Sequence, residues 1–131
     1  MLSKINPLPV FFFIAAMMIG TVASADTPKT QAEQEIHYLL QYVATSGATF
    51  IRNGDEHSAE DAADHMAMKY RRASRYAKTA EDFIDNLASK SSFSGKAYTV
   101  VTADGQNLTS RDWLYSALED YRQNRTASTA D

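Results

Sequence analysis

Histidines and carboxylates are the first residues in this chain whose types could do chemistry. His57 and His65 lie among the acids Asp61 and Asp64, and His65 follows Asp61 by four residues, which would place both on one face of a helix. A metal site needs three or four such ligands, and this spacing supplies two. The chain also has no HExxH motif and no cysteine. The sequence therefore predicts no metal site and no cofactor.

Serine hydroxyls are the next candidates, as the nucleophile of a hydrolase. The stretch from Ser91 to Lys96 holds three serines, but no G-x-S-x-G motif surrounds them. Phe93 occupies the position at which a Ser-x-x-Lys pair ending in Lys96 would need its serine. We therefore expect no catalytic residue among Ser91, Ser92 and Ser94.

The same stretch could bind an anion. Hydroxyl groups, the backbone amides around Gly95 and the ammonium of Lys96 all suit a phosphate or a carboxylate. Against this, the stretch follows a predicted helix, and the C-terminal end of a helix is its negative pole. Turn and capping roles are therefore favoured, and we expect Phe93 to anchor the stretch in the core.

Capping patterns and apolar periodicity place four helices around these residues. Thr30 and Glu33 have the spacing of a capping box, and apolar residues then recur at i, i+3, i+4 and i+7. Similar caps begin the other three helices. The predicted helices run from about Gln31 to Ser46, from Ser58 to about Tyr76, for a short stretch after Thr79, and from Thr109 or Ser110 to Arg122.

Two β-branched and aromatic runs predict a small sheet. The first, Thr49 to Arg52, leads directly into Asn53-Gly54, a pair that favours a tight turn. The second, Tyr98 to Thr102, is the natural partner of the first. Together the elements predict an α+β domain that is helix-dominated, with four helices and a two- or three-stranded antiparallel sheet.

The N-terminal segment has the pattern of a secretory signal peptide. An apolar run from Val10 to Gly20 follows Lys4, and Ala23-Ser24-Ala25 offers the small residues that signal peptidase accepts. The apolar run is too short to span a membrane, so we expect cleavage before Asp26. This divides the 131 residues into a signal peptide (1–25), a single globular domain (26–123) and a disordered tail (124–131).

The net charge and the cysteine content indicate which partners and which cellular location to expect. The chain has 13 basic and 16 acidic side chains, and loss of Lys4 would make it one unit more acidic than its net charge of −3. Mild acidity argues against a nucleic-acid binder. Because the chain lacks the cysteine to which a lipid anchor is attached, we expect a mature protein that is soluble in the periplasm or outside the cell.

Several blocks of sequence form an ordered series along the chain. The blocks are Glu35-Ile36 with Leu39-Leu40, Phe50-Ile51-Arg52-Asn53-Gly54, Thr79-Ala80-Glu81-Asp82-Phe83-Ile84, Ser91-Ser92-Phe93-Ser94-Gly95-Lys96 with Tyr98, and Trp113-Leu114. Together they resemble the YfeK-like family of uncharacterised bacterial periplasmic proteins. The resemblance extends from about Glu33 to Tyr121, and it implies export and a single domain but no activity.

The chain departs from the family pattern at two positions. Members of the family often carry a cysteine where this chain has Ala48, and another around Thr102. If those cysteines form a disulfide between the strands, this chain has lost both halves of it. Such a bridge is consistent with the strand pairing predicted above, and its loss would leave the hairpin region looser.

The polar residues within the resemblance have two possible roles. Either they hold turns and caps together, with Arg52 paired to Glu81, or they converge on a recognition surface. Turn chemistry favours the first explanation for several of them. The residues concerned are Arg52, Asn53, Glu81, Ser91, Ser92 and Ser94, with Lys96 adjoining them.

The leading functional hypothesis is a non-enzymatic periplasmic domain that binds an envelope protein or a small ligand. Binding would use the turn at Arg52 and Asn53 together with the loop from Ser91 to Lys96. The alternative is an envelope enzyme or inhibitor that acts on peptidoglycan-like material. Such an enzyme would need a carboxylate such as Glu81 beside a second carboxylate or a serine.

Overall fold

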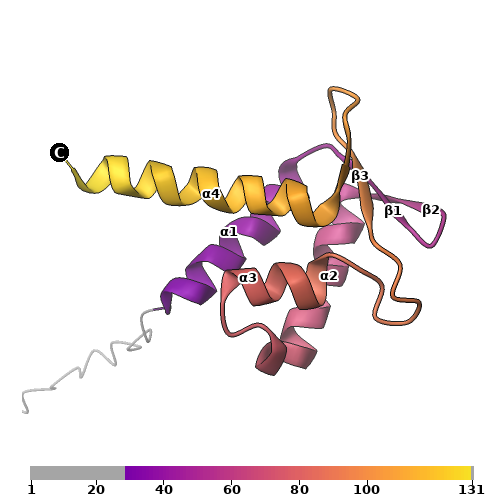
Figure 1. Ribbon diagram of the computed structural model, residues 1–131, viewed down its shortest axis with the longest axis horizontal. Helices are drawn as coiled ribbons and strands as arrows, with labels where there is room; N and C mark the ends of the chain where they lie inside the picture. The colour runs from indigo at the N-terminus through magenta and orange to yellow at the C-terminus, as the bar shows by residue number, and fades with distance from the viewer. Residues whose placement is uncertain (1–28, 131) are drawn as a thin grey trace, which may run out of the picture.

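The computed structural model describes residues 29–130, so the predicted signal peptide and its cleavage site lie outside the described residues. Four helices and a small sheet make up the fold (Figure 1). The elements in chain order are α1 (Gln31–Thr45), β1 (Thr49–Arg52), β2 (Asp55–Ser58), α2 (Ala59–Ala73), the 3-10 turn η1 (Ser74–Tyr76), α3 (Ala80–Phe83), the π-helical turn η2 (Ile84–Ala88), β3 (Thr99–Val101), β4 (Asn107–Thr109) and α4 (Ser110–Thr129). The prediction of a helix-dominated α+β fold is confirmed.

Side-chain caps begin each of the four helices at the predicted residues. The hydroxyl of Thr30 accepts a hydrogen bond from the amide of Glu33, whose carboxylate accepts one from the amide of Thr30. The hydroxyls of Ser58, Thr79 and Thr109 each accept a hydrogen bond from the amide three residues later, at the starts of α2, α3 and α4. These caps satisfy amides that have no partner within the helix, and they fix where each helix begins.

The sheet has four antiparallel strands in the order β2-β1-β3-β4, one more than the largest number predicted. β1 and β2 are joined by Asn53 and Gly54, both with positive φ, which is the geometry that an Asn-Gly pair favours. The sequence of β2, Asp-Glu-His-Ser, is polar and largely exposed, so no apolar alternation revealed it. Its pairing with β1 is set by the turn.

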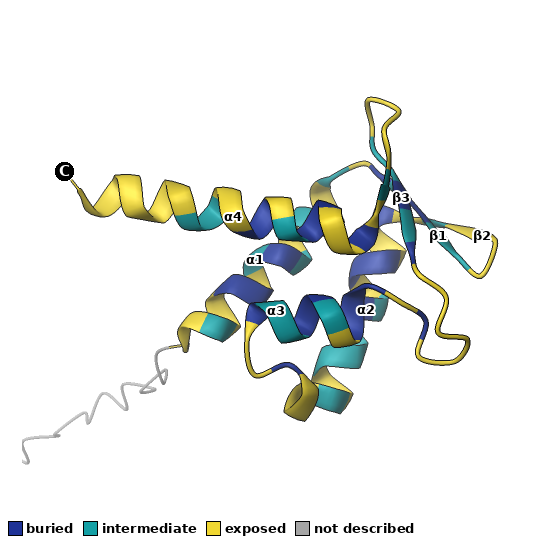
Figure 2. Ribbon diagram, in the orientation of Figure 1, coloured by how far each residue is buried: buried dark blue, intermediate teal, exposed yellow. Residues whose placement is uncertain are grey.

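The core lies between the helices and one face of the sheet. Phe50 of β1 and Val100 of β3 are buried towards the helices, and the Phe50 ring meets the Trp113 ring of α4 at 5.5 Å. Figure 2 shows the buried stripes of the helices facing one another. The largest fully buried side chains include Phe83, Ile36, Leu39, Met66, Ile84, Leu114 and Leu118. Burial of each contributes about 1.5–3 kcal/mol.

The C-terminal segment differs from its prediction. α4 continues to Thr129, whereas the sequence predicted a helix ending near Arg122 and a disordered tail. No glycine or proline interrupts the segment, and the hydroxyls of Thr126, Ser128 and Thr129 donate to backbone carbonyls four residues earlier. The exposed end of α4 projects from the body of the molecule (Figure 2). Within residues 29–130, no helix combines the length and apolar character needed to cross a membrane.

Candidate functional site

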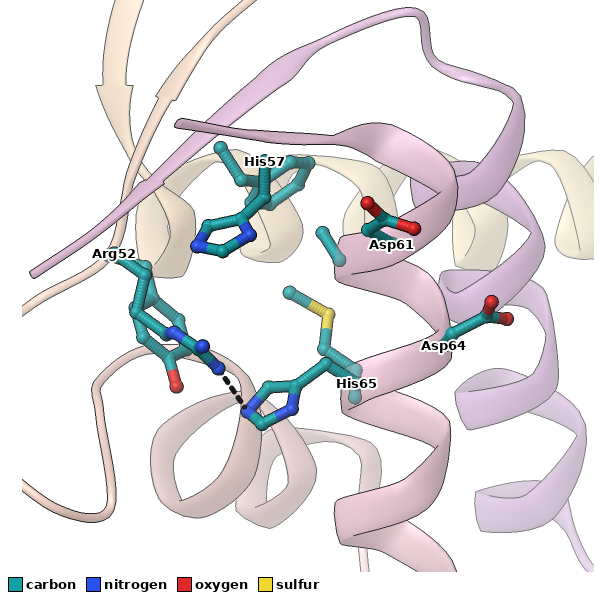
Figure 3. Close-up of a pocket in the computed structure, with 9 residues that line it drawn as sticks. Arg52, His57, Asp61, Asp64 and His65 are labelled. Atoms are coloured by element: carbon teal, nitrogen blue, oxygen red, sulfur yellow. Dashed lines mark hydrogen bonds between the residues drawn. The ribbon is translucent and has the colours of Figure 1, made fainter. Parts of the chain in front are cut away.

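Two adjoining cavities lie where the sheet meets α2. The histidine cavity has a volume of about 310 Å³ and is lined by Phe50, Arg52, His57, Asp61, Ala62, Asp64, His65, Met66 and Tyr98 (Figure 3). The serine-loop cavity has a volume of about 380 Å³ and is lined by Arg52, Asn53, His65, Lys69, Ser91, Ser92, Phe93 and Tyr98. Arg52, His65 and Tyr98 are common to both, so the two cavities share a wall.

The strands and one helix bring these side chains together. Phe50 and Arg52 alternate with Ile51 along β1 and therefore lie on the same face of the sheet, and His57 of β2 stands opposite Phe50. His65 and Lys69 lie one turn apart on α2, so both can meet that face. The site thus depends on the packing of α2 against the first hairpin.

A hydrogen bond joins the two elements at the shared wall. The guanidinium Nη1 of Arg52 lies 2.9 Å from Nε2 of His65. A guanidinium only donates, so Nε2 accepts, and the imidazole is neutral with its proton on Nδ1. Burial lowers the pKa of His65, and the neighbouring charges of Arg52, Lys69 and His57 lower it further. His65 is therefore neutral in this arrangement.

Lys69 is held at the other side of the serine-loop cavity. Its ammonium lies 5.5 Å from the centre of the Tyr98 ring, 3.5 Å from the Tyr98 hydroxyl and 3.3 Å from the carbonyl oxygen of Lys90. These are long contacts for a charged donor. Burial and the charge of Arg52 lower the pKa of Lys69. The ammonium is half-buried without a strong partner.

No carboxylate neutralises this pair of cations among the residues the structure describes. The ion pairs between residues 29 and 130 involve Arg111 and Arg122, and none includes Arg52 or Lys69. In Figure 3, Asp64 points away from the bonded pair of Arg52 and His65. The serine-loop cavity is therefore lined by two cations and no carboxylate, whereas Asp61 and Asp64 line the adjoining histidine cavity.

The turn after β1 is fastened to the serine loop, defined as Ser91 to Lys96. The Ser94 hydroxyl donates to the side-chain carbonyl of Asn53 at 2.5 Å, and the Asn53 amide donates to the Ser91 hydroxyl at 3.4 Å. The Ser91 hydroxyl also accepts from the amides of Phe93 and Ser94. Asn53, Ser91 and Ser94 thus connect two segments far apart in sequence.

The tip of the serine loop differs from its prediction. Phe93 is 98% exposed, whereas we expected it to anchor the loop in the core. The loop closes on itself, because the Ser91 amide donates to the Lys96 carbonyl and the Gly95 amide donates to the Ser91 carbonyl. It therefore needs no apolar anchor. Ser92 and Phe93 line the serine-loop cavity, and Lys96, also exposed, joins the loop through its backbone.

Glu81 lies in a different cluster, so the predicted pairing of Arg52 with Glu81 is wrong. The Glu81 carboxylate accepts from Nη1 of Arg122 at 2.6 Å, and Arg122 also contacts the buried Glu35 at 2.5 and 3.1 Å. This cluster ties α3, α4 and α1 together. The hydrogen bond from Arg122 lowers the pKa of Glu81.

Lys69 and Tyr98 belong to the site, although sequence reasoning did not select them. Lys69 lies within the helix predicted from Ser58 to about Tyr76, and Tyr98 begins the second predicted strand. The spacing of His65 and Lys69 on α2 was the signal that could have found the cluster. Their approach to Arg52 depends on tertiary packing, which no local pattern encodes.

The geometry offers little to a metal ion. Between residues 29 and 130, no three histidine, cysteine or acidic side chains gather as a metal site would require. The buried Nε2 of His57 has no hydrogen-bond partner in the described structure, and it belongs to a side chain that lines the histidine cavity. Such a nitrogen can bond to a bound molecule or to water.

Comparison with known proteins gives a family and one relative. The family of unknown function DUF5329 matches residues 30–122. The chain is similar to the Uncharacterized protein YfeK of Salmonella typhimurium, with 36% identity over 86 residues, which cover 65% of this chain and 71% of that protein. No solved structure matches the chain. The matched region contains all the residues of both cavities.

Proposed function

This chain belongs to the family of unknown function DUF5329, and we propose that it is a non-enzymatic binding domain exported to the cell envelope. Export is supported by the apolar run and the Ala23-Ser24-Ala25 site that precede Asp26. Binding is supported by the two cavities at Arg52. The unknown occupant is an envelope protein or a small ligand.

One observation carries the binding proposal: a nearly fully exposed aromatic side chain stands beside cations that no carboxylate balances. Phe93 is 98% exposed at the rim of the serine-loop cavity, and Arg52 and Lys69 line that cavity. Aromatic residues and arginine are enriched where proteins bind their partners. An unbalanced, half-buried charge costs stability, which a binding role would explain.

The contacts of Ser91 and Glu81 favour a structural role for each over an enzymatic one. The hydroxyl of Ser91 accepts from two backbone amides and from Asn53, and none of its hydrogen bonds between residues 29 and 130 joins it to a base. A general acid needs a raised pKa, whereas the pKa of Glu81 is lowered by Arg122. The carboxylate that an envelope hydrolase would use is thus engaged in holding helices together.

Site-specific photo-crosslinking tests the binding proposal in the native envelope. A photoreactive phenylalanine analogue would replace Phe93, and the matched control would carry it at Tyr76, which is 53% exposed in η1. We expect a discrete crosslinked product from position 93, weaker when Arg52 is changed to Gln, and none from position 76. Equal crosslinking from both positions, or none from position 93, would contradict binding at this surface.

Export has its own test. The mass of the protein isolated from its host should correspond to a chain that begins at Asp26, and osmotic shock should release it. A full-length chain that stays with the cytoplasm would contradict export and would leave the crosslinking result to be judged separately.

A further inference from the structure

We propose that the serine-loop cavity binds a phosphate monoester through Arg52, Lys69, His65 and the hydroxyl of Tyr98. The inference rests on the proposed binding function and gives the chemical class of the ligand. It goes beyond the sequence-level anion hypothesis, because the cations that carry it come from β1 and α2, outside the serine loop.

The local charge indicates a doubly negative group. Arg52 and Lys69 supply two positive charges, and the ion pairs between residues 29 and 130 leave both without a carboxylate. A carboxylate ligand would balance one of these charges, whereas a phosphate monoester carries nearly two near pH 7. Half-buried cations also interact more strongly with an anion than exposed cations do.

The hydrogen-bond donors indicate an oxyanion. A guanidinium has five N–H groups, and the described contact with His65 uses one of those of Arg52. The ammonium of Lys69 has contacts of 3.3 and 3.5 Å, which are long enough to be exchanged for shorter ones. Both side chains can therefore turn donors toward a ligand without losing a strong bond.

His65 adds a proton-linked donor. While neutral, it accepts from Arg52; once protonated, both its ring nitrogens donate and it needs an acceptor. An oxyanion between Arg52 and His65 would accept from both. Arg52 of β1, Lys69 of α2 and His57 of β2 lower the pKa of this imidazole, and the carboxylates of Asp61 and Asp64 line the histidine cavity with it. Binding of an oxyanion should therefore favour the protonated form of His65.

The rim suggests what the phosphate is attached to. Phe93 is exposed and lines the same cavity, so an aromatic or apolar substituent on the ester can pack against its ring. Ser92 lines the cavity as well and is exposed. A soluble phosphate ester and a lipid headgroup share this chemistry, so the experiment must separate the two sources.

Calorimetric titration with phenyl phosphate tests the site at constant ionic strength. The mature protein should bind it saturably and more tightly than acetate, and inorganic phosphate should compete. Arg52→Gln and Lys69→Gln should each weaken binding about tenfold or more, the range expected for a lost hydrogen bond to a charged group. Arg72→Gln removes the same charge from an exposed position on α2 and should change affinity less than about threefold.

Arg52→Gln and Lys69→Gln change different elements of the fold. If one variant does not fold, the other still tests the proposal. A third arm adds phosphatidic acid vesicles. If the protein cosediments with the vesicles and phenyl phosphate competes with that binding, the site is assigned to a lipid headgroup. If the protein does not cosediment with them, the site is assigned to a soluble ester.

Absence of saturable phenyl phosphate binding, or binding that Arg72→Gln weakens as much as Arg52→Gln, would overturn the inference. Crosslinking from position 93 without phosphate binding would overturn the phosphate assignment alone. Loss of crosslinking as well would overturn the proposed function too.

Discussion

At the scale of single residues, Arg122 joins carboxylates from two other helices. Glu35 is 2% exposed, and its carboxylate is bonded to the guanidinium of Arg122 through both oxygens. Arg122 also binds Glu81, so one guanidinium serves two carboxylates. A buried carboxylate that loses its partner keeps its desolvation cost.

Arg122→Gln should therefore lower the free energy of unfolding by about 3 kcal/mol. The exposed Arg125→Gln on the same helix should cost less than about 1 kcal/mol, since it loses a surface contact with the Tyr121 ring. Urea unfolding monitored by circular dichroism measures both. Equal losses would show that Glu35 does not depend on Arg122.

His65 gives stability a pH dependence of known sign. Burial and the cations around it lower its pKa in the folded chain, whereas the unfolded value is about 6.5. As the pH falls through about 6.5, the unfolded chain takes up a proton before the folded chain does, so stability falls. We expect the free energy of unfolding of the wild type to decrease from about pH 7 to pH 5.5, and that of His65→Gln to decrease less. Parallel pH profiles would contradict this.

At the scale of elements, the serine loop depends on one buried hydroxyl. Ser91 is 5% exposed, and its oxygen accepts from Asn53, Phe93 and Ser94. Removal of this acceptor leaves those amides without a partner, and each lost bond costs about 1 kcal/mol. The loop would then open more often, although the helices would stay folded.

Ser91→Ala should speed amide hydrogen exchange at Phe93 and Ser94 by about tenfold and lower the melting temperature modestly. Ser92→Ala, an exposed neighbour in the same loop, is the control and should leave both unchanged. Unchanged exchange in Ser91→Ala would mean that other contacts hold the loop.

Local chemistry explains which elements could be predicted. The caps at Thr30, Ser58, Thr79 and Thr109 are short-range contacts, so the sequence located the helix starts well. β2 was missed because its strand conformation comes from pairing with β1 rather than from its own polar residues. The end of α4 was missed because polarity was read as disorder, although no residue there breaks a helix.

The residues of the candidate site also fall into two groups, those that the sequence indicates and those that only tertiary packing brings together. The resemblance to the YfeK-like family selects Arg52, Asn53 and the serines, and the structure brings them together. Lys69 and Tyr98 join them through the packing of α2 and β3 against β1, which has no short-range signal. Glu81 was assigned to the wrong partner because sequence separation does not reveal which arginine a carboxylate meets in space.

At the scale of the whole molecule, the sheet places two distant segments side by side. Thr49 pairs with Val101 in antiparallel register, so continuation by one residue sets Ala48 against Thr102. Both residues line one further cavity. These are the positions at which the resemblance to the YfeK-like family implies cysteines.

Replacement of Ala48 and Thr102 by cysteine should therefore yield a disulfide under oxidising conditions. The bridge should raise the free energy of unfolding by about 2–4 kcal/mol, because it restricts the unfolded chain. Thiol titration and thermal melts with and without reductant measure this. Persistent free thiols in the oxidised double variant would contradict the register continuation.

The claim that the region around Arg52 is a binding site for an anionic group is tested most directly by amide chemical-shift mapping. With phenyl phosphate added to the isotopically labelled mature protein, saturable shifts should be concentrated at Arg52, Asn53, His65, Lys69, the serine loop and Tyr98. They should be nearly absent in Arg52→Gln. Shifts spread over the exposed end of α4, or no saturable shifts at all, would contradict the claim.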